Sequence, residues 1–456
     1  MDTTHRLIPE HPYESYDEYL KQFGGKSPVL KARQAGPDAV IKEVKDAGLR
    51  GRGGAGFPTA IKWTTTKNHP CPTRYVVCNA SEGEPGTYKD RFLIQKNPYA
   101  TIEGMLIAAH VVSAKGLYIA IKGVYTREIA RLEKALEEVR AKGLLDGVPF
   151  NIVHGPDSYL YGEEKALLEV VEGNEPMPRE VHYPPFEKGL FASIESPNPA
   201  LVNNAESYAR VPGIIHHGAA SFRSIGSSDT AGYLIFTLCG DVAKPGLYEV
   251  EAGITLRELL NKYGGGPKPG RKFKAEISGV ASGVVPESKF DTPADFGSLA
   301  KAGGGLGSAG FIVMDDSVNI PRVAQTLTHF LYVESCHQCG SCKSGLREAS
   351  LALNEFCEGR TGKSDPIERA LAAVMGGSQT TRCYLPVEGG LMLPSLIKNF
   401  PEEFKDQAAA VAAAVFATPK IKDYDEAKHV ITYDAHYSEK QPDWTYAAPG
   451  ETVLIR

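Results

Sequence analysis

The sequence predicts an α/β protein with further, smaller domains, because three different patterns follow one another along the chain. Short apolar runs alternate with helical segments between residues 74 and 153, which is typical of a parallel sheet covered by helices. Two strand signals, a helix and a third strand between residues 233 and 280 predict a small ββαβ unit. From residue 322 onward helix formers dominate and predict a helical bundle. At 456 residues the chain is too long for one core, so we expect at least three domains.

Each expected element rests on a local pattern of apolar residues. Apolar runs without helical period predict strands, and apolar residues three or four apart predict helices. We expect strands at 74–79, 116–122 and 150–153 and helices at 99–113, 126–142 and 163–172. Further on we expect strands at 233–239, 246–250 and 273–280 and helices at 255–263, 322–333, 343–358, 365–375, 393–400 and 401–416. The proline-rich stretch 175–199 would be a long ordered loop or lid.

Composition shifts set the domain boundaries that we expect. Residues 1–231 would hold an N-terminal arm and the α/β domain, classed as a non-standard Rossmann-like fold. Prolines interrupt the first 40 residues, which predicts an extended arm followed by a short helix before Gly48. Residues 232–321 would form the small β domain and residues 322–418 the bundle. The tail, residues 419–456, has no clear periodicity, and the sequence assigns it no role.

Composition and charge disfavour several classes of function. A net charge of -5 gives no basic footprint for nucleic acid. The N-terminus lacks the basic and apolar regions of a secretory signal, and the longest apolar stretch, 105–121, is interrupted by His110, Ser113 and Lys115. We therefore expect no membrane span and a cytoplasmic chain, either free or as a peripheral subunit on the cytoplasmic face of the inner membrane.

Three thiols are spaced three residues apart at the predicted start of a helix: Cys336, Cys339 and Cys342. A 4Fe-4S cluster needs four thiolates, and Cys383 follows the next helix and can supply the fourth. Structural zinc also accepts four cysteines, but usually from two paired knuckles, so we favour the cluster. The other cysteines have no partner at ligand spacing and are expected to be small core residues: Cys71, Cys78, Cys239 and Cys357.

A glycine-rich segment, Gly51 to Pro58, has four glycines in its first six residues. Glycines let the backbone approach a ligand and aim successive N–H groups at a phosphate, and Arg52 and Lys62 would add positive charge. A plain turn explains such a run about as often. No strand precedes the segment and Pro58 closes it, so a standard dinucleotide-binding turn is disfavoured.

Three further polar segments could line a ligand pocket. Residues 79–87 leave the first strand, and ligand-binding groups of α/β proteins lie at such strand ends. Residues 159–164 come just before a helix, and Asn203 and Asn204 offer two amides for ribityl hydroxyls or ring edges. Each segment alone could equally be a solvated turn or a helix cap.

Taken in chain order, these segments resemble the flavoprotein (51 kDa, NADH-binding) subunit of respiratory complex I and the diaphorase subunits of NAD-linked hydrogenases and formate dehydrogenases. The similarity extends from about Leu49 to Phe404. It implies an FMN domain, a ubiquitin-like (SLBB, β-grasp) domain and a bundle with a 4Fe-4S cluster held by Cys336, Cys339, Cys342 and Cys383. It also implies cofactor-binding roles, for FMN or for NADH, at Gly51, Arg52, Gly53, Gly54, Ala55, Gly56, Phe57, Lys62, Asn79, Ser81, Glu82, Glu84, Tyr159, Gly162, Glu163, Glu164, Phe186, Asn203 and Asn204.

The same resemblance implies a function. A hydride would pass from NADH to FMN, and single electrons from there to the 4Fe-4S cluster and a partner, with no side chain needed as acid or base. The implied partners are a 2Fe-2S (24 kDa-like) subunit and further iron-sulfur subunits of a larger complex. A carboxylate at Glu164 beside the adenosine ribose would favour NADH over NADPH.

The sequence departs from the family pattern at several positions. Ser81 stands where an aspartate is common, Thr65 where an aromatic is common, and Tyr161 replaces a cysteine. Residues 337–343 lack the usual Gly, Pro and Arg around the cluster cysteines. Two other interpretations therefore stay open: a diaphorase subunit of a soluble hydrogenase, formate dehydrogenase or bifurcating complex, and a flavin-free structural or assembly subunit.

Overall fold

The computed structural model describes residues 4–180, 183–360, 362, 364–378 and 381–446. The chain divides into two compact units. The first unit comprises Met1–Gly83, Tyr88–Phe236 and Glu249–Ile254, and the second comprises Glu84–Thr87, Thr237–Tyr248 and Thr255–Arg456.

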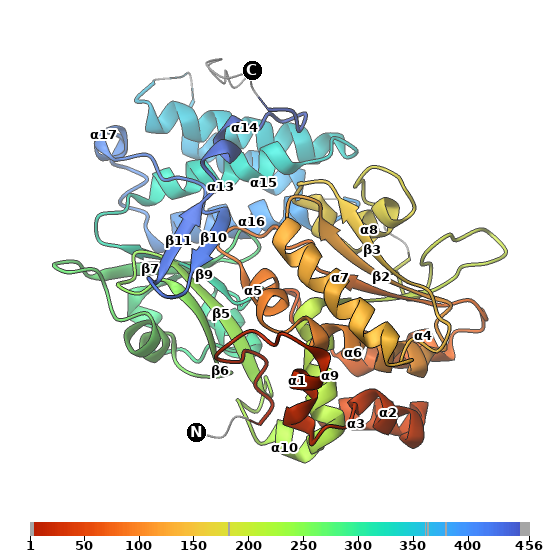
Figure 1. The fold of residues 1–456 in the computed structure, drawn as a ribbon. Helices are drawn as coiled ribbons and strands as arrows, with labels where there is room; N and C mark the ends of the chain where they lie inside the picture. Colours follow the sequence, from red (N-terminus) through yellow and green to blue (C-terminus); the bar gives the residue numbers. More distant parts are fainter. Residues whose placement is uncertain (1–3, 181–182, 361, 363, 379–380, 447–456) are drawn as a thin grey trace. The chain divides into compact units, whose positions relative to one another are not determined.

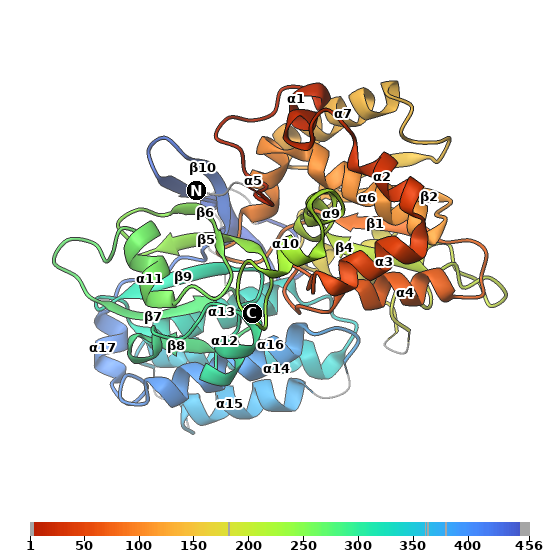
Figure 2. The same ribbon diagram turned by 90° about the horizontal axis from the view of Figure 1, so that it is seen from below.

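The first unit is built on a four-stranded sheet of order β3-β2-β1-β4, of which Figure 1 labels β2 and β3 and Figure 2 labels β1, β2 and β4. All three strand pairings are parallel, as the alternation of strands and helices predicts. In the register, Asn79 stands opposite Asn204 on one side and Ala120 on the other. The strands are β1 (Tyr75–Asn79), β2 (Gly116–Lys122), β3 (Phe150–Gly155) and β4 (Ala200–Asn204).

Helices cover this sheet, and α6 is buried along almost its whole length. A Cβ atom on Gly104 of α6 would lie 2.0 Å from the carbonyl oxygen of Tyr208, so α6 and α9 pack at backbone distance and only glycine fits there. Helices α3 (Pro37–Asp46) and α4 lie side by side (Figure 2). The helices after the arm are α4 (Thr59–Asn68), α5 (Lys89–Lys96), α6 (Pro98–Val112), α7 (Thr126–Ala141), α8 (Glu164–Val171), α9 (Ala205–His217) and α10 (Ala219–Arg223).

The N-terminal arm is more helical than the sequence predicts. It forms α1 (Tyr16–Leu20), α2 (Pro28–Ala35) and α3 (Pro37–Asp46), of which only α3 is the expected short helix. The error lies in treating proline as a breaker, because α2 and α3 each begin at a proline, where the missing N–H costs nothing. The hydroxyls of Tyr16 and Tyr19 donate to the carboxylate of Glu103, which fixes the arm to α6.

The β domain is a five-stranded sheet of order β6-β5-β9-β7-β8. Its strands are β5 (Tyr233–Gly240), β6 (Gly246–Glu251), β7 (Phe273–Ser278), β8 (Val284–Pro286) and β9 (Gly310–Asp315). The helices are α11 (Leu256–Glu258), continued by a π turn (Leu259–Tyr263), and α12 (Phe296–Ala302). The predicted ββαβ unit is present, and β9, parallel to β5, completes the sheet. Because β9 is buried on both faces, it lacks the alternation that marks a strand in a sequence.

The helical bundle contains α13 (Ile320–Glu334), α14 (Gly340–Cys357), α15 (Pro366–Gly377), α16 (Leu385–Asn399) and α17 (Gln407–Ala412). Helix α16 begins eight residues before its predicted start and continues through Pro394, while α17 is much shorter than 401–416. The tail contains an antiparallel hairpin, β10 (Ile421–Asp425) with β11 (Val430–Tyr433), and a 3-10 turn (Ala435–Glu439). Its last residues, 447–456, lie outside the described part of the chain.

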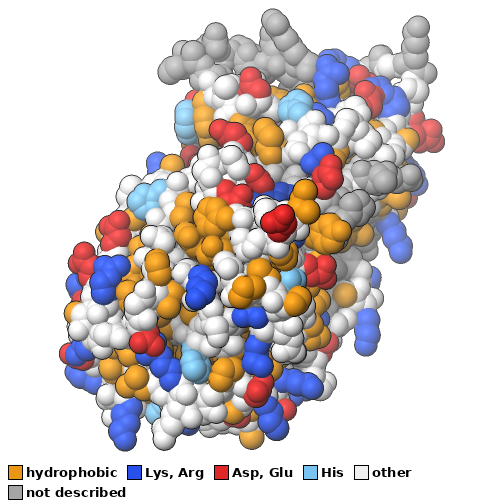
Figure 3. Space-filling view, turned by 90° about the vertical axis from the view of Figure 1, so that its right-hand side faces the viewer, with side chains coloured by type: hydrophobic (Ala, Val, Ile, Leu, Met, Phe, Trp, Pro, Cys, Tyr) orange, Lys and Arg blue, Asp and Glu red, His pale blue; other side chains and the backbone are white. Residues whose placement is uncertain are grey.

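On the face drawn in Figure 3, lysine and arginine side chains are interspersed with aspartate and glutamate among the described residues. Within the residues that the structure describes, no helix combines the length and apolar character needed to cross a membrane.

Candidate functional site

The carboxyl ends of two neighbouring strands meet beside the glycine-rich loop in the first unit. Asn79 ends β1 and Asn204 ends β4, and the two residues are register partners. A Cβ atom on Gly53 would lie 3.2 Å from the Cβ of Asn204, and the N–H of Arg52 donates to the Ser207 hydroxyl at 2.8 Å. The loop is thus held against the strand edge at which α/β proteins bind ligands.

The glycine-rich loop closes on itself and leaves its tip open. The N–H of Gly51 donates to the carbonyl oxygen of Phe57 at 2.8 Å. Gly54 and Gly56 have φ values of 132° and 62°, which side chains disfavour. A Cβ atom on Gly54 would meet nothing within 4 Å, so this backbone faces open space. Such a backbone, with Ala55 exposed beside it, fits the approach of a phosphate group.

Arg52 does not add its positive charge to this loop, which corrects our expectation. Its side chain is buried, and its Nη2 atom donates to the carbonyl oxygens of Ala231 at 2.6 Å and Tyr233 at 3.4 Å. Burial lowers the pKa of the guanidinium to about 10. The side chain turns inward because two carbonyl oxygens and the carboxylate of Glu206 offer it negative charge there.

Lys62 supplies the positive charge beside the loop. Its Nζ atom forms an ion pair with Glu164 at the start of α8 and donates to the carbonyl oxygen of Val202 at 3.3 Å. The same Nζ lies 6.0 Å from the ring centre of Phe57, whose side chain is 41% exposed. A cation, a carboxylate and an accessible aromatic ring therefore share one corner of the site.

A polar network joins the end of β1 to the segment before α8. The amide of Asn79 donates to the carbonyl oxygen of Gly162 at 2.7 Å. The hydroxyl of Ser81 lies 3.0 Å from the Tyr161 carbonyl oxygen and 2.8 Å from the side-chain oxygen of Asn79. Glu163 caps α8, because its Oε2 atom accepts from the N–H groups of Lys165 and Ala166, and burial raises its pKa. Ser81 thus performs a neutral, structural task in this network.

The amide of Asn204 is fully engaged within the protein. Its oxygen accepts from Lys89 Nζ at 3.0 Å and from the N–H of Glu206 at 3.1 Å. Its nitrogen donates to Asp90 at 2.6 Å and to the Asn79 carbonyl oxygen at 3.4 Å. Because an amide has two donors and two acceptor positions, this geometry fits a positioning role better than direct ligand binding.

The other expected site residues lie in different surroundings. Asn203 is buried, and its amide oxygen accepts from the indole N–H of Trp63 at 3.0 Å. Glu82 caps α5, and burial followed by the charge of Asp90 raises its pKa to about 7. Glu84 belongs to the second unit, where it accepts from the N–H of Val280 at 2.6 Å. Tyr159 and Phe186 are half-buried.

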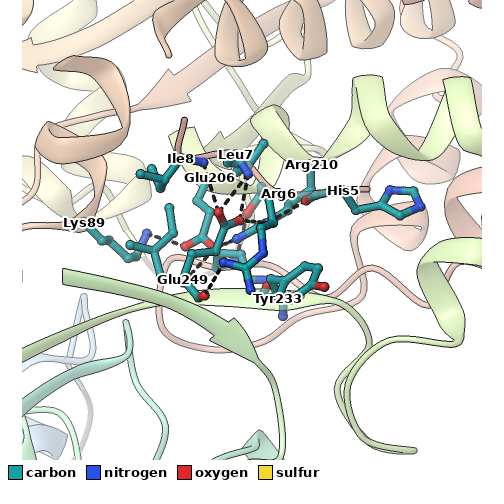
Figure 4. A network of polar contacts seen from close by, with 12 residues as sticks. His5, Arg6, Leu7, Ile8, Lys89, Glu206, Arg210, Tyr233 and Glu249 are labelled. Atoms are coloured by element: carbon teal, nitrogen blue, oxygen red, sulfur yellow. Dashed lines mark hydrogen bonds and ion pairs between the residues drawn. The ribbon is translucent and has the colours of Figure 1, made fainter. Parts of the chain in front are cut away.

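Sequence reasoning missed a chain of buried charges behind this site (Figure 4). Lys89, 1% exposed, contacts Asp90 at 2.7 Å and Glu206 at 3.3 Å as well as Asn204. Glu206 pairs with Arg210 at 2.8 Å, and Arg210 pairs with Glu249 at 2.6 Å. The signal in the sequence is a set of charged residues inside apolar segments, but their partners are far apart in the chain.

Four cysteines of the second unit, the expected cluster ligands, lie around the start of two helices. Cys336 and Cys339 precede α14, Cys342 lies in its first turn, and Cys383 comes two residues before α16. The N–H of Arg382, next to Cys383, lies 3.4 Å from the sulfur of Cys339. The pKa of Cys342 is raised to about 11. Burial is the main cause and the nearby Cys339 and Cys336 add to it, while the Ser335 hydroxyl 3.4 Å away acts in the opposite direction.

Across the described ranges of the chain, no three side chains of His, Cys, Asp or Glu converge as a single metal ion requires. A 4Fe-4S cluster binds each of its thiolates at a different iron, so its ligands surround a volume and do not converge on one point. A set of four thiols, two of which have an N–H or a hydroxyl group next to the sulfur, fits the chemistry of such a cluster.

Known families match three parts of the chain. Residues 44–213 match the Nuo51 FMN-binding domain, residues 235–284 the SLBB domain, and residues 322–407 the NADH-ubiquinone oxidoreductase-F iron-sulfur binding region. Among solved structures, the NAD+-reducing NiFe hydrogenase in its H2-reduced state has a TM-score of 0.76 at 29% identity, over 85% of this chain and 66% of that chain.

Curated relatives match over most of their length. The F 2 subunit of the NADH-quinone oxidoreductase of Rhizobium meliloti (strain 1021) is 41% identical over 81% of this chain and 88% of its own. The F subunit of the Aquifex aeolicus (strain VF5) enzyme is 37% identical over 86% of this chain and 91% of its own. The F subunit of the Escherichia coli (strain K12) enzyme is 36% identical over 88% of this chain and 92% of its own. These matches confirm the resemblance found in the sequence, and the chain belongs to the family of NADH-quinone oxidoreductase F subunits, which are FMN- and 4Fe-4S-binding oxidoreductases.

Proposed function

We propose that this chain is the NADH-oxidising, electron-input subunit of a complex I-like enzyme. The observation that carries the proposal is the open glycine loop held at the carboxyl edge of β1 and β4, in a chain that belongs to the F-subunit family. FMN, when bound, accepts a hydride from NADH and returns the two electrons singly.

The first unit offers a phosphate site and an orienting edge for FMN. The backbone of Gly51 to Gly56 would receive the phosphate group, with the Lys62 cation beside it. Asn79, Ser81 and Gly162 would fix the edge against which the flavin lies, and Asn204 would hold that edge in place from behind. Tyr159, Glu163 and Asn203 would complete the surroundings of the FMN.

Phe57 and Glu164 would recognise NADH. Phe57 exposes enough of its ring to stack on a planar group, and Glu164 stands at the N-terminus of α8, partly exposed. A carboxylate at this place accepts hydrogen bonds from a ribose diol and repels a 2′-phosphate, which supports a preference for NADH. Glu84 and Phe186 are also proposed as NADH contacts.

Cys336, Cys339, Cys342 and Cys383 would hold the cluster. The N–H of Arg382 and the hydroxyl of Ser335 lie beside two of the four sulfurs. Hydrogen bonds to cluster sulfurs stabilise the reduced, more negative state, so these groups would help to set the reduction potential.

The chain acts together with other subunits, because it belongs to a family of enzyme subunits. We propose a 2Fe-2S subunit as the next electron carrier and a place on the cytoplasmic face of the inner membrane. A diaphorase subunit of a soluble hydrogenase is the second candidate, favoured by the TM-score of 0.76 to the hydrogenase chain. The subunits that co-purify with the chain distinguish the two.

Cofactor analysis tests the proposal. We expect the purified chain to contain one FMN and the four irons of one 4Fe-4S cluster, and to reduce ferricyanide with NADH much faster than with NADPH. Colourless protein that contains zinc but neither iron nor FMN would contradict the proposal and support a structural or assembly role.

A further inference from the structure

The tail to which the sequence assigns no role reaches the cysteine-bearing segment of the same unit. After the hairpin of β10 and β11, residues 435–446 run along α13 and the loop that follows it. We call residues 435–446 the C-terminal strap. All of its contacts described below lie within the second unit.

The strap is anchored on Glu334, two residues before Cys336. The Glu334 side chain is buried and accepts hydrogen bonds from Tyr437 Oη at 2.9 Å and from Lys440 Nζ at 2.7 Å. Lys440 is itself only 2% exposed, so this is an ion pair shielded from water. The ring of Tyr437 also packs against Phe330, with ring centres 5.6 Å apart. Burial on this scale is unusual for a lysine and a glutamate unless they are paired.

A second set of hydrogen bonds joins the strap to the cysteine loop itself. The carbonyl oxygen of Pro442 in the strap accepts from His337 Nε2 at 3.2 Å and from Lys343 Nζ at 2.9 Å. His337 lies between Cys336 and Cys339, and Lys343 directly follows Cys342. Lys343 also donates to the carbonyl oxygens of Ser335 at 3.0 Å and Tyr332 at 2.9 Å. Its buried ammonium group therefore joins the strap to both ends of the loop.

We propose that the C-terminal strap is part of the cluster site, where Glu334 and Lys343 are positioning residues that hold the Cys336–Cys342 loop in its ligand geometry and limit the access of water. The inference rests on the proposed ligation of a 4Fe-4S cluster by these cysteines. The loop from Ser335 to Cys339 contains no regular secondary structure and carries two of the ligands. Such a loop needs outside contacts to stay ordered, and the strap provides them.

The test uses the full chain with its cluster and two variants of the strap. Lys440→Met removes the buried ion pair while keeping the length of the side chain, and Tyr437→Phe removes one hydroxyl and changes no charge. Lys428→Met is the matched control, because Lys428 lies in the hairpin turn of the same tail, 75% exposed, and pairs with Asp425. An excess of a coloured iron chelator is added, and the release of iron is followed under anaerobic conditions.

We expect faster iron release in both strap variants than in the wild-type chain or the control. The increase should be at least about tenfold for Lys440→Met and about threefold for Tyr437→Phe, because hydrogen bonds to buried charged groups are the strong ones. The midpoint potential of the cluster in Tyr437→Phe should become more positive, because water stabilises the additional negative charge of the reduced cluster.

The outcomes separate this inference from the proposed function. Wild-type protein without iron would contradict the cluster itself. If the wild-type chain contains four irons, and iron release and midpoint potential are unchanged in Tyr437→Phe, the proposed role of the strap is wrong. The proposed cluster is not affected by that result. If Lys440→Met does not fold, Tyr437→Phe decides alone, since it removes a single oxygen atom.

Discussion

Lys62 and Glu164 are 102 residues apart in the sequence and form an ion pair beside the glycine loop. The pair joins α4 to the N-terminus of α8, and the Lys62 side chain is mostly buried while that of Glu164 is 38% exposed. In this arrangement the two charges neutralise each other. We expect phosphate and ribose groups to compete for both side chains when a nucleotide binds.

Replacing Glu164 by glutamine should weaken the discrimination against NADPH. The amide no longer repels a 2′-phosphate, so the ratio of kcat/KM for NADH to that for NADPH should fall about tenfold, equivalent to about 1.4 kcal/mol. Steady-state kinetics with both nucleotides measure this ratio. Glu133→Gln on the exposed face of α7 is the control, and an unchanged ratio in Glu164→Gln would place the ribose elsewhere.

Replacing Cys383 by serine should remove or cripple the cluster. Serine is a poor substitute for a thiolate ligand, and the remaining three thiols leave one iron without its protein ligand. Iron analysis and the EPR spectrum of the reduced protein measure the loss. Cys71→Ser, a change at a cysteine whose sulfur contacts Thr73 and Asn198, should keep its iron. Full iron content in Cys383→Ser would show that the fourth ligand is another residue.

Replacing Lys89 by methionine should reduce both stability and FMN binding. Asp90 and Glu206 would stay buried without their shared cation, which typically costs about 3 kcal/mol or more. The amide of Asn204 would also lose the donor that orients it, and we expect FMN to bind about tenfold more weakly. Thermal unfolding and a flavin fluorescence titration test the two effects. Lys67→Met is the control, because the partner of Lys67, Asp38, is 90% exposed and can be solvated without it. A Lys89→Met protein that matches this control in both measurements would contradict the positioning role of Lys89.

Glu103 should make the stability of the chain depend on pH. Burial raises its pKa from 4.5 to about 7, although hydrogen bonds from Ser27, Tyr16 and Tyr19 lower it. The folded state therefore binds a proton that the unfolded chain has already lost between these two values. The stabilisation is complete below about pH 4.5 and disappears as the pH rises through about 7.

Glu103→Gln stays neutral at every pH, so its melting temperature should fall less than that of the wild-type chain between about pH 5 and pH 8. The shift corresponds to about 3 kcal/mol at most. Comparison with Glu133→Gln isolates the effect of this one buried group. Parallel pH profiles for all three proteins would show that Glu103 is ionised throughout.

Three of the four strands of the parallel sheet could be predicted because their signals are local, whereas β4 was not predicted. The strand Gly116–Lys122 matches its prediction at both ends, since a buried apolar run bounded by polar residues needs no knowledge of its partners. The tail hairpin was missed for the opposite reason. Most residues of β11 are exposed or half-buried, so the strand has no apolar face to reveal it.

The candidate site could be predicted in its segments but not in its contacts. The glycine loop, the end of β1, the start of α8 and the amides of Asn203 and Asn204 were recognised by composition, although the strand that ends at Asn204 was not predicted. The direction of the Arg52 side chain depends on Ala231, 179 residues away, and Glu249 meets the N–H of Leu7, 242 residues away. Such long-range pairs between buried polar groups leave no periodic pattern, which is why the Lys89 network was missed.

Anaerobic addition of NADH to the purified chain, followed at once by visible absorption and by EPR, shows whether this chain takes electrons from NADH. We predict that the flavin absorption bleaches and that the signal of a reduced 4Fe-4S cluster appears in the same sample, while Cys383→Ser shows only the bleaching. Protein that contains both FMN and iron, yet shows neither change when NADH is added, would contradict the proposed role of this chain as the subunit that oxidises NADH.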